Sequence, residues 1–267
     1  MDDKVEIDGA EVAYRVDGSG PALVLVSGTG GNLHSNWDHL MEPLAAHRRV
    51  IRVDYSGSGD TRDDGRALTV SMLAEQVLAA VRACSVASFD LLGYSLGSAV
   101  AAHITAEYPQ LVRSLVLVAP FAQGGEPRIK LQFELWQQLI RLDPAAFARL
   151  VLLNGFSPAF LRGFDDRQIG QWVELIQQSN RWDGMLRQVE LDARLDVSGQ
   201  LARIDRPTLV IGCLQDYILG PEPARAIARA ISGARYAELD AGHMAPFERP
   251  QELLQLVGEF LAVPARG

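Results

Sequence analysis

The sequence predicts an α/β fold in which helices cover both faces of a mostly parallel β-sheet. Two observations predict it. Short apolar runs of strand length alternate along the chain with segments whose apolar residues recur at helical spacing. The strand runs are also apolar at consecutive positions, which is typical of parallel strands buried on both faces. A chain of 267 residues is long enough to enclose one large core of this kind.

Most expected strands are short apolar runs, and the stretches 37–44 and 70–81 carry an apolar stripe at helical spacing. The strands are expected over residues 4–16 (a β-pair with its turn at Asp8-Gly9), 22–26, 50–53, 89–92, 115–118, 207–212 and 235–239. The helices are expected over about 37–44, 70–81, 96–108 and 250–261. Thr69 is the expected N-cap of the second of these helices. Helices in these places supply the crossovers that parallel strands require.

The strand pattern stops from about Pro120 to Ala202. Helix starts replace it, such as Asp143-Pro144 and Ser157-Pro158, where a capping side chain precedes a proline at the first helical position. Because strands resume afterwards, we interpret this stretch as an all-helical insertion within one domain. The expected organisation is a core domain over 1–119 and 203–267, with a helical cap over 120–202.

Composition narrows the class of protein. The formal net charge of −8 argues against nucleic acid as a partner, because that affinity comes mainly from Lys and Arg that neutralise phosphates. The only cysteines, Cys84 and Cys213, form no CxxC pair and are expected to be buried thiols. The sequence shows no signal-peptide pattern and no apolar run long enough to cross a membrane, so we expect a cytoplasmic protein.

The segment Gly93-Tyr94-Ser95-Leu96-Gly97 matches G-x-S-x-G and lies between an expected strand and an expected helix. That context is the one a nucleophile elbow requires. Glycines on both sides leave room for a tight turn that exposes the serine, and a helix N-terminus favours nearby negative charge. Ser95 is therefore the candidate nucleophile.

A serine hydroxyl needs a general base to activate it, and that base needs a third group to orient it. His39, His47 and His103 fall in expected helical stretches, whereas His243 follows the last strand in a loop. The acid should precede the histidine at the end of a strand, and Asp216 does so. Asp240 is nearer to His243 in sequence and stays the alternative.

With these motifs in place, the chain resembles the α/β-hydrolase superfamily over nearly its whole length. Four blocks carry the resemblance: residues 26–31, residues 54–59, the Ser95 elbow, and the pair formed by Asp216 with residues 241–243. It implies an eight-stranded sheet, a helical cap after the sixth strand, a pocket between cap and core, and no cofactor. It also assigns the oxyanion hole to the backbone N–H groups of Leu96 and Thr29. The family's early block commonly begins His-Gly, whereas Ser27-Gly28 stands here, so the support of that loop is altered.

The expected insertion is rich in aromatic residues, which suggests a small hydrophobic or aromatic substrate. Trp136, Trp172 and Trp182 are the candidate apolar contacts, while Asn32 and His34 are candidate polar contacts beside the oxyanion loop. The insertion is expected to set substrate choice without taking part in the chemistry. The expected reaction is hydrolysis of an ester or thioester through an acyl-enzyme.

Three alternatives compete with this interpretation. A dinucleotide site at residues 28–33 lacks the third glycine, since Leu33 stands there. A ligand-binding receptor on the same scaffold leaves the three candidate catalytic residues unexplained. Non-hydrolytic chemistry on the same residues, such as carbon–carbon cleavage, cyclisation or acyl transfer, stays open, as does the oligomeric state.

Overall fold

The computed structural model describes residues 2–262 and contains one eight-stranded sheet. The strand order is β1-β2-β4-β3-β5-β6-β7-β8. β1 pairs with β2 and β2 with β4 antiparallel, and every other neighbouring pair is parallel. The strands are β1 (Asp3–Ile7), β2 (Ala10–Asp17), β3 (Ala22–Val26), β4 (Arg49–Val53), β5 (Phe89–Tyr94), β6 (Val112–Val118), β7 (Thr208–Cys213) and β8 (Arg235–Leu239). The predicted mostly parallel sheet is confirmed.

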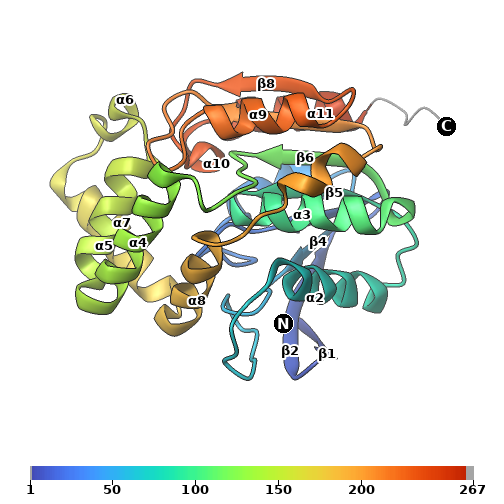
Figure 1. The fold of residues 1–267 in the computed structure, drawn as a ribbon, viewed down its shortest axis with the longest axis horizontal. Helices are drawn as coiled ribbons and strands as arrows, with labels where there is room; N and C mark the ends of the chain where they lie inside the picture. Colours follow the sequence, from blue (N-terminus) through green and yellow to red (C-terminus); the bar gives the residue numbers. More distant parts are fainter. Residues whose placement is uncertain (1, 263–267) are drawn as a thin grey trace.

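Helices cover both faces of this sheet, which produces two separate cores (Figure 1). The helices are α1 (Met41–Ala45), α2 (Val70–Ala83), α3 (Leu96–Glu107), α4 (Pro127–Leu142), α5 (Pro144–Gly155), α6 (Pro158–Leu161), α7 (Asp166–Ser179), α8 (Trp182–Asp192), α9 (Glu222–Ala230), α10 (Ala245–Glu248) and α11 (Pro250–Leu261). α2, α3 and α9 pack on one face, and α1 and α11 pack on the other. Alternate residues of the central strands point into the two cores, which explains why these strands are apolar throughout.

The predicted elements differ from the structure mainly in length. The stripe that begins at Trp37 is divided between a 3₁₀ turn (Asp38–Leu40) and the five-residue α1, and His47 lies in the turn that follows rather than in a helix. Thr69 caps α2 as predicted, because its hydroxyl accepts from the backbone N–H of Met72.

The stretch between β6 and β7 is helical, as its sequence predicts. Asp143 and Ser157 cap α5 and α6, each accepting from a backbone N–H three residues later. Figure 1 shows α4 to α8 gathered at the side of the sheet towards which the arrows of β6 and β8 point. The helices therefore stand over the carboxyl ends of the parallel strands, where open α/β sheets bind ligands.

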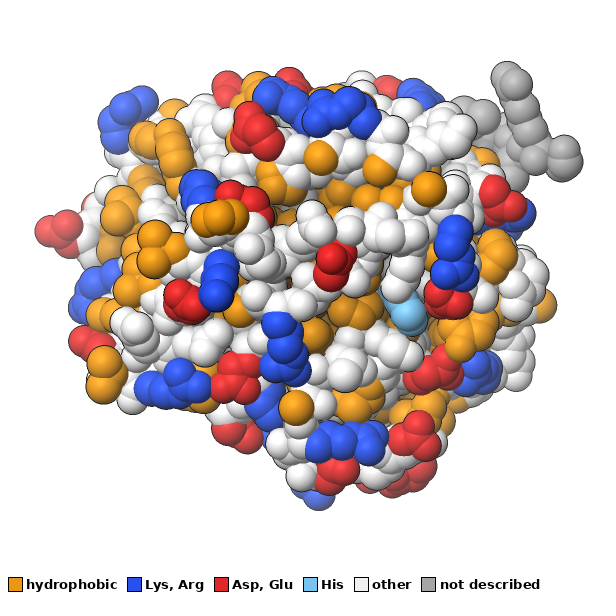
Figure 2. All heavy atoms as spheres, viewed as in Figure 1, with side chains coloured by type: hydrophobic (Ala, Val, Ile, Leu, Met, Phe, Trp, Pro, Cys, Tyr) orange, Lys and Arg blue, Asp and Glu red, His pale blue; other side chains and the backbone are white. Residues whose placement is uncertain are grey.

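The surface in Figure 2 carries interspersed basic and acidic side chains, with no continuous basic stripe on the face shown. Within residues 2–262, no helix has both the length and the apolar character to cross a membrane. Cys84 and Cys213 are free and buried, as predicted.

A substitution at Gly97 in α3 would test how closely this helix packs on the sheet. A Cβ there would lie 2.2 Å from the carbonyl oxygen of Val26, so we expect Gly97→Ala to lower the free energy of unfolding by about 3 kcal/mol. The control is Gly258→Ala in α11, where a Cβ meets no atom within 4 Å and helix propensity predicts a gain of up to about 1 kcal/mol. Urea unfolding of both variants checks this, and similar effects at the two sites would contradict the close packing.

Candidate active site

Ser95 lies in a strained turn between β5 and α3. Its φ of 54° and ψ of −121° are unfavourable for a residue with a side chain, so the surrounding structure must hold it there. Gly93 and Gly97 permit the turn, since a Cβ on Gly93 would lie 2.2 Å from the carbonyl oxygen of Gly97. The Ser98 hydroxyl closes the turn by donating to the Gly93 carbonyl oxygen at 2.7 Å. This is the strand–turn–helix geometry that G-x-S-x-G predicts.

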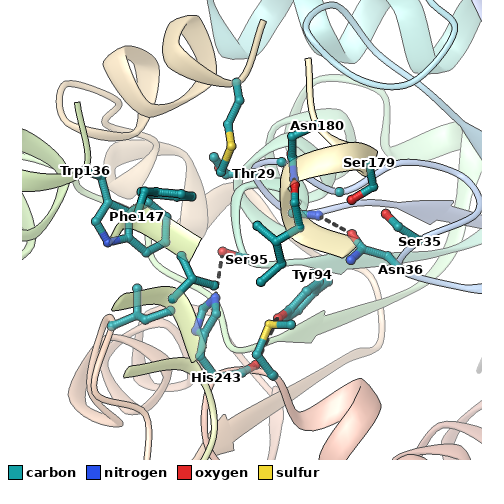
Figure 3. Close-up of a pocket in the computed structure, with 18 of the residues that line it drawn as sticks. Thr29, Ser35, Asn36, Tyr94, Ser95, Trp136, Phe147, Ser179, Asn180 and His243 are labelled. Carbon is teal, nitrogen blue, oxygen red and sulfur yellow. Dashed lines mark hydrogen bonds between the residues drawn. The ribbon is translucent and has the colours of Figure 1, made fainter. Parts of the chain in front are cut away.

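Ser95, His243 and Asp216 lie within hydrogen-bond distance of one another in a chain. His243 Nε2 is 3.0 Å from Ser95 Oγ (Figure 3). His243 Nδ1 is 2.7 Å from Asp216 Oδ2. All three side chains are buried. With Nδ1 protonated towards the carboxylate, Nε2 is free to accept the serine proton.

The carboxylate beside His243 belongs to Asp216 and not to Asp240. Asp216 Oδ1 accepts from the backbone N–H groups of Ile218 and Leu219, at 2.9 and 2.8 Å, which fixes the carboxylate towards the imidazole. Asp240 is exposed, and its side chain accepts from Gln215 instead.

The loop that carries His243 is held by buried polar contacts that the sequence did not reveal. The Tyr94 hydroxyl donates to the backbone carbonyl of His243 at 3.0 Å. The buried Glu248 carboxylate accepts from the backbone N–H groups of Gly242 and Ser157, at 3.0 and 2.9 Å. Buried polar groups are costly unless they are paired, so these contacts position the imidazole firmly.

A glycine-rich loop after β3, residues 28–31, lies beside Ser95. A Cβ on Gly28 would be only 3.0 Å from the Ser95 Cβ. Leu96 is the first residue of α3, so its N–H has no acceptor within the helix. Within residues 2–262, the Thr29 N–H also has no backbone or side-chain acceptor. Both predicted oxyanion donors are thus unpaired at the site.

A pocket of about 160 Å³ opens at Ser95 and His243. Helices α4, α5 and α7 supply much of its apolar lining, which includes Phe133, Trp136, Phe147, Val151 and Trp172. Figure 3 shows neutral polar side chains on the side of Ser95 opposite Trp136 and Phe147. These polar side chains are Ser35, Asn36, Ser179 and Asn180. The pocket therefore combines an apolar wall with an uncharged polar wall.

Two of the five predicted substrate contacts line this pocket. Trp136 and Trp172 do so, but Trp182 packs behind the pocket-lining Phe147, with their ring centroids 5.8 Å apart. Asn32 and His34 do not line it either. The Asn32 side chain accepts from nearby backbone N–H groups, and the exposed His34 ring pairs with Asp2 and Asp38. Asn32 therefore stabilises its own turn and His34 forms surface pairs, and neither side chain faces the pocket.

Two buried carboxyl groups lie close to the glycine-rich loop 28–31. Burial raises the pKa of Asp54 to about 6, although the carboxylate accepts from the backbone N–H groups of Leu33 and Asp60. Burial raises the pKa of Asp192 to about 8, and there the Thr29 hydroxyl is the partner. Asp192 is therefore mostly protonated at neutral pH. No cluster of three or more His, Cys, Asp and Glu side chains suited to a metal ion occurs within residues 2–262.

Comparison with known proteins gives the family. The α/β hydrolase fold family matches residues 21–250. This chain belongs to that family. Pyrrolizixenacetamide deacetylase of Xenorhabdus hominickii is 48% identical over 97% of both chains. The crystal structure of a hydrolase from Pseudomonas aeruginosa shares 31% identity, a TM-score of 0.88 and 98% coverage of both chains.

A second solved structure, the enol-lactonase of Burkholderia xenovorans, shares 25% identity and a TM-score of 0.86, covering 98% of this chain and all of the other. With relatives of this kind, this protein is a hydrolytic enzyme of the family. The predicted superfamily and enzyme class are confirmed.

The raised pKa of Asp192 makes stability depend on pH. Between about pH 4 and 8 the folded protein binds one proton at Asp192 that the unfolded chain releases, so the free energy of unfolding falls as pH rises. Near pH 7, where the folded Asp54 is mostly ionised, the slope from Asp192 is about 1.2 kcal/mol per pH unit. We expect Asp192→Asn to remove that slope and to stabilise the protein at pH 7. Urea unfolding of both proteins at several pH values measures the slope. An unchanged slope in the variant would show that another group binds the proton.

Proposed function

We propose that the protein is a serine hydrolase that removes a small acyl group from a compact, largely apolar ester or amide. The observation that carries the proposal is the hydrogen-bonded chain from Asp216 through His243 to Ser95, which ends at the pocket. In this proposal Ser95 is the nucleophile, His243 the general base and acid, and Asp216 the orienting carboxylate.

The proposed reaction has two stages. His243 Nε2 takes the Ser95 proton while Oγ attacks the acyl carbonyl, and the N–H groups of Leu96 and Thr29 bind the oxyanion that forms. The imidazolium then protonates the departing alcohol or amine, which leaves an acyl-serine. Water, activated by the same histidine, releases the acid and restores the enzyme.

The relative's name and the pocket together support a small acyl group. The Xenorhabdus protein is named as a deacetylase, and its 48% identity extends over nearly the whole chain. The pocket of about 160 Å³ at Ser95 is of a size that suits a small acyl group. An acetylated amide is therefore the first substrate class to test, beside the esters and thioesters that the sequence suggests.

The polar wall supports a second feature of the substrate. Asn36 Oδ1 accepts from the Gly28 N–H, and Asn180 Nδ2 donates to the Ile176 carbonyl oxygen. The other ends of these two amides and the hydroxyls of Ser35 and Ser179 give this wall donors and acceptors but no charge. It suits a neutral carbonyl, amide or hydroxyl on the substrate, at a distance from the apolar wall. We also propose that residues 120–202 act as the cap, because α4, α5 and α7 supply the walls of the pocket.

The first test of this function is loss of the nucleophile. We expect Ser95→Ala to fold but to lose fluorophosphonate labelling and to lower kcat by about 10⁶-fold on acetyl esters and acetamides. Intact mass spectrometry measures the labelling, and a panel of acetyl ester, thioester and amide substrates measures turnover. Labelling that persists in the folded variant would remove Ser95 from the proposal.

The orienting carboxylate has a natural control in Asp240. We expect Asp216→Asn to lower kcat by about 10⁴-fold, because the imidazole loses both its orientation and the stabilisation of its charged form. Asp240→Asn, which changes an exposed side chain beside Gln215, should leave kcat unchanged. The reverse pattern would assign the orienting role to Asp240.

The two pocket tryptophans should act on substrate binding. Trp136→Ala and Trp172→Ala remove apolar contacts that exist before and during the reaction, so we expect KM to rise about tenfold with a smaller change in kcat. Trp182→Ala, outside the pocket lining, is the control. It should change KM less than the other two variants when all are assayed at a temperature where each is folded. Kinetics on a short and a longer acyl ester would contradict this if all three variants lost activity equally on both.

A further inference from the structure

Helix α8, which lies within the expected cap, accepts one hydrogen bond from the backbone and one from a side chain of loop 28–31. The Gly30 N–H donates to Gln188 Oε1 at 2.9 Å. On its other side, Gln188 Nε2 donates to the carbonyl oxygen of Ser56 and to the Ser58 hydroxyl, at 3.2 and 2.8 Å. Gln188 is fully buried, so it joins the oxyanion loop to the loop after β4 without competition from water.

One turn further along α8, Asp192 contacts the adjacent residue of the oxyanion loop. The Thr29 hydroxyl donates to Asp192 Oδ2 at 2.6 Å, and Asp192 is fully buried. Its Oδ1 has no hydrogen-bond partner within the described chain. A carboxyl group in this position is costly to bury, so packing alone does not explain it.

The backbones approach closely enough for α8 to act as a fixed support. A Cβ on Gly184 would lie 2.5 Å from the carbonyl oxygen of Gly57, and one on Gly30 would lie 2.6 Å from the terminal methyl of Met185. The Arg187–Asp63 ion pair, at 2.9 Å and largely shielded from solvent, ties the same helix to the sheet-end loops. α8 is therefore part of the wall behind the oxyanion loop.

We propose that Gln188 and Asp192 are positioning residues that hold loop 28–31 beside Ser95 with the Thr29 N–H free to bind the oxyanion. This inference rests on the proposed function. The Gly30 N–H lies in the peptide plane that follows Thr29, so its hydrogen bond to Gln188 restrains that plane, and the hydroxyl bond to Asp192 restrains the Thr29 side chain. Together they hold Thr29, whose own N–H is left free within the described chain. Ser27 stands where the family commonly has a histidine, and in this protein α8 supports the loop through Gln188 and Asp192.

The charge of Asp192 matters to this role. An ionised carboxylate behind the oxyanion loop would oppose the negative charge that forms in the transition state. Thr29 is the hydrogen-bond partner of Asp192. The Tyr55 hydroxyl donates to the Ser27 carbonyl oxygen. Burial raises the pKa of Tyr55, and Asp192 is close enough for its charge to raise that pKa further. Neither neighbour is a cation, so a neutral acid suits the site, and an amide of the same shape should replace it.

The experiment compares Asp192→Leu, Asp192→Asn and Gln188→Leu with Asp183→Leu, a change of an exposed carboxylate on the same helix. We expect Asp192→Leu and Gln188→Leu to lower kcat about 10- to 100-fold on an acetyl ester, with KM nearly unchanged. Binding of a boronic acid that mimics the tetrahedral oxyanion should weaken by a similar factor. Asp192→Asn and Asp183→Leu should retain kcat within about threefold.

A readout that needs no turnover separates this inference from the proposed function. Amide hydrogen exchange over residues 27–33 should rise in Gln188→Leu and Asp192→Leu, while the rest of the sheet keeps its protection. A double-mutant cycle adds Thr29→Val. The fall in kcat in the double variant should not exceed that in Asp192→Leu alone, because both substitutions remove the same hydrogen bond.

Additive losses of kcat in the double-mutant cycle would overturn the inference. Unchanged amide hydrogen exchange over residues 27–33 in both leucine variants would also overturn it. So would raised exchange with unchanged kcat and boronate binding. Equal losses in Asp192→Asn and Asp192→Leu would do the same, because the amide preserves the contact. If the wild-type protein neither reacted with fluorophosphonate nor hydrolysed any substrate, the proposed function would fail, while the exchange measurement would still decide whether α8 holds the loop.

Discussion

The turn at Ser95 is the constraint on which the site depends. β5 is a central strand with β3 and β6 as parallel neighbours, and α3 must start immediately after it and lie back on the sheet. That reversal requires a positive φ at Ser95 and leaves no room for side chains at Gly93 and Gly97. The strain of one residue is thus balanced by the packing of a whole strand–helix unit, which presents the hydroxyl at the sheet edge.

The other groups reach that hydroxyl because the carboxyl ends of parallel strands meet at one edge. Asp216 follows β7 and His243 follows β8, and Gly28 to Gly31 follow β3. Proximity alone does not fix a hydrogen bond, however. Glu248 and Tyr94 hold the histidine loop, and the N–H groups of Ile218 and Leu219 hold the carboxylate. Each support is a buried polar group with a partner, so displacing any of them would leave an unpaired group in the core.

Local patterns predicted the fold, and they singled out three residues that the structure brings together, for physical reasons. Strands buried on both faces are apolar throughout, and a serine between two glycines at a strand-to-helix turn is a specific signal of a nucleophile elbow. The pocket contacts were harder to predict, because which face of an insertion helix meets the cavity depends on how the helices dock. Trp136 and Trp182 look alike in sequence, yet Phe147 stands between Trp182 and the cavity. Asn32 and His34 lie outside the pocket lining for another reason, since Asn32 pairs within its own turn and His34 pairs with Asp38 and Asp2.

Gln188 and Asp192 carried no sequence signal, because a Gln and an Asp near a helix end normally face solvent. Only the docking of α8 against two loops, permitted by Gly57 and Gly184, turns them inward. A buried acid with a raised pKa lowers stability at neutral pH, whereas an amide or a well-packed apolar residue would not. A group that costs stability and touches the oxyanion loop is better explained by what it does for that loop than by folding. If the proposed role of Gln188 and Asp192 is right, the inner face of α8 supports the reaction, and the expected separation between a cap that selects substrate and a core that performs chemistry ends at this helix.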